Sequence, residues 1–252
     1  MAFVFEKQPD HRLTAEQLAV YTATLARRTP LLRATRDDLS AVHNPHTVPV
    51  GSVEFVRALA ARWGAEEDLL AVTLSNYPEA LHGFLARKPV LTTWGTARSS
   101  LQPLFVKPGS SRDLKVFTGQ VFAPADFARH RYPDDMPVWV CEPLPPLRSE
   151  HRVYILRGDI LGMGRYDDSE DEAALPDMTA INAMVTALGP SAPAGYALDV
   201  AVCNGRTILI EATDGWAIGY YRGTCPAAEY TTLLTARWHE IMAEVDSPGM
   251  QP

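Results

Sequence analysis

The sequence predicts an α+β fold with a small α/β part at its N-terminus. Helix and strand signals are mixed over residues 1–100, and from residue 101 the pattern changes to short apolar runs separated by turn residues, which is typical of hairpins. Strands grouped in hairpins, together with separate helices, favour an α+β fold over a repeated βαβ sheet.

Length and pattern divide the chain into three ranges. At roughly 150 residues per domain, 252 residues make one large domain or two closely joined ones. We expect an α/β part at 1–100, a second part at 101–245 and a frayed tail at 246–252. The boundary near residue 100 is gradual, so independent folding of the first part stays an open question.

The first helix is predicted from its start signal. Thr14 and Gln17 form a capping-box pattern, in which each side chain satisfies a backbone N–H of the first turn. The residues that follow have helical spacing, and we expect the apolar face to carry Leu18, Tyr21 and Leu25.

Three further elements are expected before residue 100. Ser52 is a good N-cap for a second helix, which Gly64 would end. The apolar run 69–74 fits a short buried strand, and the segment 77–87 fits a helix.

The second part is predicted to consist of seven strands and two helices. The strands are expected at 104–107, 115–122, 138–142, 150–157, 160–166, 196–203 and 207–213. The helices are expected at 177–188, closed by Gly189, and at 227–244.

Net charge excludes one class of partner. The chain has 23 Lys and Arg against 30 Asp and Glu, a formal charge of −7. A sequence-independent nucleic-acid binder needs clustered cations to neutralise phosphates, so we expect no nucleic-acid partner. A small anionic ligand held by a few placed cations remains compatible with this charge.

Cysteine usage and hydropathy predict a cytoplasmic protein. Cys141, Cys203 and Cys225 are an odd number without paired spacing, which favours free thiols in a reducing compartment. Residues 1–10 lack the pattern of a secretory signal, and no apolar stretch approaches the ~20 residues of a spanning helix. We therefore expect no membrane partner.

The hairpin at 150–166 carries two arginines. A two-residue turn at Gly158-Asp159 would place Arg152 directly opposite Arg165, on a face that also carries Glu150. Opposed like charges are unfavourable on a bare sheet, which suggests a bound anion between them. A solvated face neutralised by its own carboxylates is the alternative.

The hairpin at 196–213 carries two carboxylates, and its turn decides their relation. A two-residue Asn204-Gly205 turn pairs Asp199 with Ile210 and sends Glu211 to the opposite face. A three-residue loop shifts the register and makes Asp199 and Glu211 diagonal neighbours on one face. In the second case the pair suits a hard cation such as Mg²⁺.

A third segment combines a strand with a flexible loop. The apolar strand 104–107 ends in Lys107, a Gly/Ser loop follows, and Lys115 lies beyond it. Backbone N–H groups and a fixed cation can hold phosphates in this way, although the loop is not a Walker A motif.

Together these segments resemble the ATP-grasp superfamily, most closely its small RimK-like members. The resemblance spans roughly residues 100 to 223. It rests on five segments in the family order: FVKP at 105–108, VCEPL at 140–144, EHRV at 150–153, LDV at 198–200 and IEATDGW at 210–216.

The resemblance implies an ATP site and a Mg²⁺ site. The ATP-binding residues it implies are the adenine hinge at Cys141, Glu142, Pro143 and Leu144, the ribose ligand Glu150, and the phosphate ligands Lys107 and Lys115. Asp199 and Glu211 match the metal carboxylates. The usual third ligand, an asparagine two residues later, is Thr213 here, and we expect the neighbouring Asp214 to replace it.

The activity implied is ATP-dependent carboxylate–amine ligation through an acylphosphate, with release of ADP and phosphate. Arg152 and Arg165 would hold the acylphosphate or the substrate carboxylate, because phosphoryl transfer depends mostly on positioning and charge neutralisation. The expected partners are a small carboxylate and an amine, such as an amino acid or peptide, and a homodimer is possible. A kinase or thiol ligase on the same site, or a catalytically degenerate ATP-binding regulator, are the alternatives.

Overall fold

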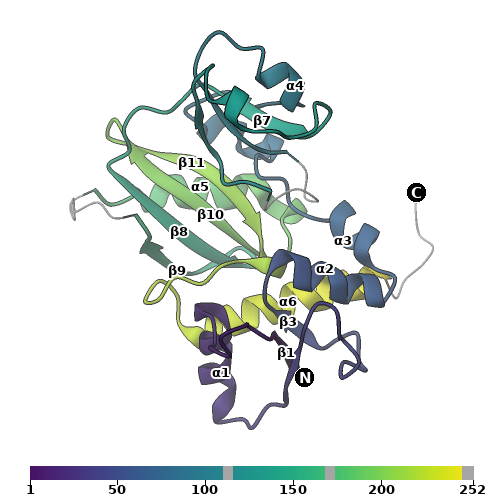
Figure 1. The fold of residues 1–252 in the computed structure, drawn as a ribbon. Coiled ribbons are helices and arrows are strands. Elements are labelled where there is room, and N and C mark those ends of the chain that lie inside the picture. Colours follow the sequence, from purple (N-terminus) through teal and green to yellow (C-terminus); the bar gives the residue numbers. More distant parts are fainter. Residues whose placement is uncertain (110–115, 168–173, 246–252) are drawn as a thin grey trace.

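The computed structural model describes residues 1–109, 116–167 and 174–245, and it confirms the α+β class. Figure 1 shows a lower N-terminal part, a central sheet and an upper sheet. The strand orders are β2-β1-β3 in the N-terminal part, β11-β10-β8-β9 in the centre and β4-β7-β5-β6 above. Only the first of these three sheets is parallel within the described ranges.

The elements follow one another without long unstructured connections in the first part and with hairpins in the second. The strands are β1 (Phe3–Glu6), β2 (Leu31–Ala34), β3 (Val48–Val50), β4 (Val90–Thr93), β5 (Leu104–Pro108), β6 (Gln120–Phe122), β7 (Pro137–Cys141), β8 (Ser149–Leu156), β9 (Asp159–Arg165), β10 (Gly195–Cys203) and β11 (Arg206–Asp214). The α-helices are α1 (Ala15–Leu25), α2 (Val53–Arg62), α3 (Glu66–Ala71), α4 (Trp94–Ala97), α5 (Met178–Leu188) and α6 (Ala227–Val245). The 3₁₀ helices are η1 (Glu79–Phe84), η2 (Phe127–Arg129), η3 (Gly189–Ser191) and η4 (Gly215–Ala217).

Helix α1 has the predicted capping box but not the predicted buried face. Leu18, Tyr21 and Leu25 are all exposed, and Val20 points into the core instead. The cause is Gln17, whose buried side-chain amide donates hydrogen bonds to the carbonyls of Glu6 and Val50 at the ends of β1 and β3. These bonds turn the helix so that the face containing Gln17 packs on the sheet.

The next elements agree with the sequence only in part. Ser52 caps α2 as predicted, and Gly64 follows it with a φ of +72°. The strand predicted at 69–74 is wrong, because this run belongs to α3, whose first turn carries three acidic residues that suit a helix N-terminus. The helix predicted at 77–87 is only the short 3₁₀ helix η1.

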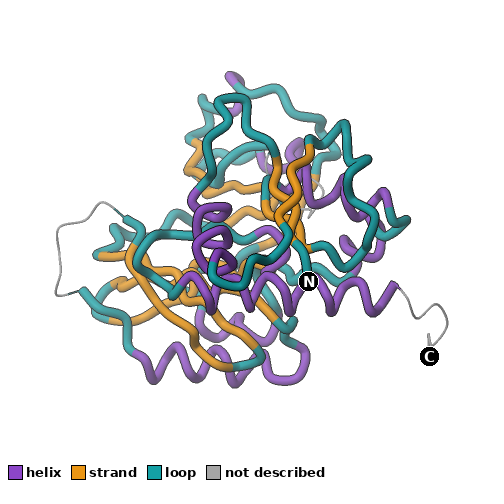
Figure 2. The backbone as a smooth tube through the Cα atoms, turned by 90° about the horizontal axis from the view of Figure 1, so that it is seen from below, coloured by secondary structure: helices purple, strands orange, loops and turns teal. Residues whose placement is uncertain are grey.

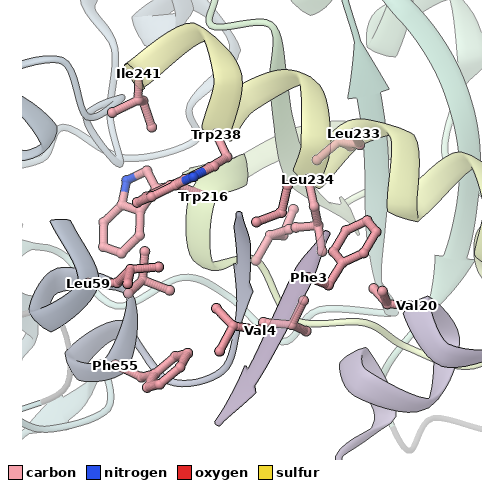
Figure 3. Close-up of a cluster of buried hydrophobic side chains, with 14 of the residues drawn as sticks. Phe3, Val4, Val20, Phe55, Leu59, Trp216, Leu233, Leu234, Trp238 and Ile241 are labelled. Carbon is pink, nitrogen blue, oxygen red and sulfur yellow. The ribbon is translucent and has the colours of Figure 1, made fainter. Parts of the chain in front are cut away.

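Helix α6 unites the two ends of the chain. Trp238 and Leu234 from α6 pack with Phe3 and Leu59 of the N-terminal part in one buried cluster, as Figure 3 shows. Figure 2 shows the helix that leads to the C-terminus passing beside the start of the chain. The indole N–H of Trp238 also donates to the carbonyl of Pro45 at 2.8 Å. The core of the N-terminal part therefore includes residues from the far end of the sequence.

The boundary expected near residue 100 does not coincide with a sheet boundary. Strand β4 precedes residue 101 and pairs with β7, so the upper sheet begins before the predicted division. The hairpin strands and both helices of the second part occur close to their predicted ranges; of 115–122, only Gln120–Phe122 is a strand among described residues. In the described ranges no helix is long and apolar enough to cross a membrane.

A buried ion pair fastens the end of β11 to α6. The guanidinium of Arg237 donates to both carboxylate oxygens of Asp214, at 2.8 and 2.9 Å, and both side chains are almost fully buried. Arg237 also donates to the carbonyl of Val72 and to Glu240. The pKa of Arg237 is lowered by burial but raised further by Asp214, so the pair stays charged.

We predict that Arg237→Met destabilises the protein by about 3–5 kcal/mol, because the substitution leaves the Asp214 carboxylate buried without its counter-charge. Urea unfolding followed by circular dichroism measures this loss. Arg129→Met is the matched control, since Arg129 pairs with Asp126 on the surface and its loss is expected to cost about 1 kcal/mol or less. Equal losses in the two variants would contradict the structural role of the buried pair.

Candidate active site

A bulge in β11 brings the two predicted metal carboxylates together. The turn has two residues, Asn204 and Gly205, with φ values of 49° and 73°, and it pairs Cys203 with Arg206. The register then shifts by one residue between Asp199 and Val200, so that Asp199 lies directly opposite Glu211. The predicted shared face is present, but it comes from a bulge within the strand and not from a three-residue loop.

Four charged side chains form a row that starts on this sheet. Arg152 on β8 is paired in register with Asp199 on β10, which is paired with Glu211 on β11, so the three side chains share a face. Arg152 donates two hydrogen bonds to the Asp199 carboxylate, at 2.7 and 2.6 Å. Lys107, at the end of β5 in the upper sheet, donates to the carboxylate of Glu211 and completes the row.

The row lies between two apolar contacts. Along β10 the same face carries Ala197, which packs with the α6 cluster, then Asp199, then Ala201, which packs with Leu144 and Leu147. The opposite face of the sheet packs on α5 through residues such as Leu198. The charged side chains are therefore held in a narrow band of the sheet that apolar packing surrounds.

Burial makes these charges depend on one another. Arg152, Asp199 and Lys107 are each less than 9 % exposed. Burial raises the pKa of Asp199, and the hydrogen bonds and charge of Arg152 act against that rise. Burial lowers the pKa of Arg152, but Asp199 outweighs this effect and the net pKa is raised. Two acids and two bases thus neutralise one another along the row.

The predicted opposition of Arg152 and Arg165 is wrong. The turn of this hairpin is Arg157-Gly158, with positive φ at both residues, and a second register shift lies between Tyr154 and Ile155. His151 therefore faces Arg165, which lies on the opposite face of the sheet from Arg152. Arg165 donates to Asp167 and to the carbonyl of Arg148. The anion expected beside Arg152 is the carboxylate of Asp199.

Aromatic side chains that the sequence did not single out as site residues border Arg152. The hydroxyl of Tyr166 donates to Glu150 at 3.0 Å, and the ring of Tyr166 stacks on Tyr221 at 5.0 Å. The guanidinium of Arg152 lies 5.0 Å from the centre of the Tyr221 ring. Glu150, the predicted ribose ligand, therefore belongs to the same face as the charged row. Alternation along β9 beyond Arg165 is the sequence signal that could have placed Tyr166 there.

The predicted hinge follows directly on β7. Cys141 is buried at the end of the strand, Glu142 and Pro143 are exposed, and Leu144 packs with Ile210 and its neighbours. Backbone groups at 142–143 are thus open at a strand end, as a nucleobase hinge requires. Lys115 lies outside the described residues.

Asp214 does not belong with the other carboxylates. Its side chain accepts from Arg237 and from the backbone N–H groups of Leu74 and Trp216. Strand alternation puts Thr213, and not Asp214, on the face of Glu211. The expectation that Asp214 is the third metal ligand is therefore not supported, because the carboxylate is already engaged in the buried ion pair.

The described residues offer two carboxylates and no larger metal cluster. No group of three His, Cys, Asp or Glu residues in these ranges could hold a metal ion. Cys141, Cys203 and Cys225 are free, and burial raises the pKa of Cys225 to about 11, so its thiol stays protonated at neutral pH. Asp199 and Glu211 supply hard oxygen donors, which fit Mg²⁺ better than they fit zinc.

Comparison with known proteins agrees with this geometry. A family model that describes the ATP-grasp domain, in the second family of one of its clades, matches residues 84–232, which is more than half of the chain. No curated protein sequence matches the chain.

Three solved structures illustrate the fold similarity, each at 12 % sequence identity. A RimK domain ATP-grasp protein from Sphaerobacter thermophilus has a TM-score of 0.56, with 92 % of this chain and 99 % of that chain covered. The ATP-grasp ligase PsnB with a minimal precursor has 0.54, with 94 % and 100 % covered. The D-alanine–D-alanine ligase of Bacillus anthracis has 0.52, with 97 % and 96 % covered. Family match and fold together show that the chain belongs to the ATP-grasp superfamily.

Proposed function

We propose that the protein is an ATP-dependent carboxylate–amine ligase. The observation that carries this proposal is the row of Arg152, Asp199, Glu211 and Lys107, in which two facing carboxylates lie between two buried cations. Phosphoryl transfer needs placed charges more than it needs a nucleophilic side chain, and the row supplies both signs. Fold similarity to ligases that act on peptides or amino acids supports the same reaction class.

The proposed nucleotide site extends from the hinge to the row. The segment from Cys141 to Leu144 would contact adenine, Glu150 would bind the ribose, and Lys107 the phosphates, with Lys115 as a further phosphate ligand. Asp199 and Glu211 would hold Mg²⁺. When bound there, the ion would neutralise phosphate oxygens and the charge that develops during transfer.

Binding of the nucleotide would exchange partners within the row. Lys107 and Arg152 are paired with carboxylates in the structure, and a polyphosphate or a substrate carboxylate offers them an equivalent anion. The exchange keeps every buried charge paired, which is the condition for charges to stay in this environment. Arg152 is placed to orient the acyl group, whereas Arg165 faces away and has no proposed role.

The reaction forms one amide bond for each ATP. A carboxylate oxygen of the first substrate attacks the γ-phosphorus, the bond between that phosphorus and the bridging oxygen breaks, and ADP leaves with the electron pair. The amine nitrogen of the second substrate then attacks the acyl carbon. Phosphate departs and the nitrogen loses a proton, which yields the amide. Lys107 and Arg152 stabilise the negative charge that builds up on the oxygens in both steps.

The first prediction concerns the products. We expect ADP and free phosphate to appear only when ATP, Mg²⁺, a carboxylate and an amine are all present, because the acylphosphate needs the amine to release phosphate. Pools of amino acids and short peptides supply both substrates, and coupled assays measure ADP and phosphate separately. ADP without free phosphate would identify a kinase, turnover that requires a thiol would identify a thiol ligase, and ATP binding without turnover would identify a regulator.

The second prediction concerns the facing carboxylates. Asp199→Asn and Glu211→Gln each keep the side-chain shape but remove the charge, so we expect turnover to fall by about a hundredfold or more while the circular dichroism spectrum is unchanged. Asp159→Asn, at an exposed hairpin tip, is the matched control and should keep full activity. Full activity in either of the first two variants would refute the proposed metal site.

A further inference from the structure

A cavity of about 310 Å³ lies beside the charged row. Segment 73–76, the end of β11, helix η4 and strand β7 all contribute to its wall. Its volume is at the low end of the roughly 300–1,000 Å³ that small-molecule sites occupy. The cavity is large enough for one amino acid or a similarly small group, and not for a nucleotide.

The cavity adjoins the place where the proposed chemistry occurs. Thr213 lines it and stands two residues after Glu211 on the same face of β11. Trp139 also lines it and is paired in register with Lys107. A group that enters the cavity therefore has its inner end next to the ion pair of Lys107 and Glu211.

The described wall of the cavity carries no free charge. Asp214 is the one ionisable residue among the described lining residues, and its carboxylate is neutralised by Arg237 and by two backbone N–H groups. The remaining wall includes the indoles of Trp139 and Trp216 and the aliphatic side chains of Leu74 and Val53. A charged group would lose its hydration here without gaining a counter-charge, which disfavours binding.

One polar atom of the wall lacks a partner. The hydroxyl oxygen of Thr213 is buried and forms no hydrogen bond within the described part of the chain. The other hydroxyl and amide groups are engaged: Thr73 donates to Leu69 and accepts from the Trp216 indole, Ser75 accepts from a backbone N–H, and Asn76 donates to Ala212. A ligand in the cavity can satisfy Thr213 with a single N–H or O–H group.

We propose that this cavity binds the amine substrate, and that this substrate is an amine with an uncharged apolar or aromatic substituent. The inference rests on the ligase function proposed above and names the substrate class of that reaction. The carboxylate substrate needs the cations of the row, whereas the amine has to reach the acyl carbon as a free base. A neutral apolar wall favours that uncharged form, because desolvation lowers the pKa of a bound amine. Thr213 is placed to hydrogen-bond the nitrogen.

The buried pair of Asp214 and Arg237 shapes this site. Asp214 accepts from the N–H of Leu74, and Arg237 donates to the carbonyl of Val72, so together they fix the backbone at both ends of the step into segment 73–76. Asn76 is tied to Ala212 by two further hydrogen bonds. Asp214 thus acts as a positioning residue for the amine cavity.

Calorimetric titration of the full chain with three amines tests the proposal: L-phenylalaninamide, the α-amide of L-glutamic acid and L-lysinamide. They differ in side-chain charge, and binding needs no turnover. We expect the neutral side chain to bind at least tenfold more tightly than either charged one, and to quench tryptophan fluorescence because Trp139 and Trp216 line the cavity. Since only the free base is expected to bind, its apparent affinity should fall about tenfold per pH unit below the pKa of the free amine.

Four variants locate the binding. Ala217→Leu fills the cavity and should weaken binding at least tenfold, whereas Ala187→Leu, on the exposed side of α5, should leave it unchanged. Thr213→Val should weaken binding several-fold by removing the hydroxyl, and Thr213→Ser should restore it.

The outcomes separate this proposal from the ligase proposal. Equal or tighter binding of the charged amines, or unchanged binding in Ala217→Leu, would overturn the assignment of the cavity even in an active ligase. Selective binding that Ala217→Leu removes, in a protein without turnover, would support the cavity as an amine site and refute the ligase function.

Discussion

One extra residue in β11 determines where the charges of this protein lie. The Asn204-Gly205 turn alone would pair Asp199 with Ile210 and send Glu211 to the face that packs on α5. The bulge returns Glu211 to the face of Asp199, where Arg152 from the neighbouring strand and Lys107 from the upper sheet meet it. A carboxylate on the α5 side would be buried among Leu198, Val200 and Leu209 without a cation, at a large cost. Packing of the sheet and formation of the site therefore require the same register.

The paired row also explains how an acidic chain can bind a polyanion. The formal charge is −7, yet the described site contains two acids and two bases in contact. A metal–nucleotide complex brings charges of both signs, and each has a partner of opposite sign in the row. The total charge correctly argues against a polymer of phosphates, because that partner would need a continuous basic surface. The local arrangement decides the binding of a small anion.

Local signals predicted the parts of the fold whose cause is local. Thr14, Ser52 and the Asn204-Gly205 turn did what their side chains and backbone preferences dictate, and the strands of the hairpins followed. Long-range contacts decided the rest: Gln17 reaches two strand ends and rotates α1, and Trp238 packs on strands more than 180 residues away. The position of Asp214 beside Arg237 is of the same kind, since 23 residues separate the two in sequence. Register shifts within β8 and β11 could not be predicted because a bulge has no fixed residue signature, which is why Arg165 was misplaced while Asp199 and Glu211 were paired by the wrong turn.

The most direct test of the account is electron paramagnetic resonance of Mn²⁺, as a substitute for Mg²⁺, in the presence of a non-hydrolysable ATP analogue. The account predicts a bound-Mn²⁺ spectrum for the natural protein that requires the nucleotide analogue and disappears when Glu211 is replaced by glutamine. Retention of the same bound spectrum after that substitution, or no bound Mn²⁺ in the natural protein with the analogue present, would contradict the claim that the facing carboxylates form the metal–nucleotide site.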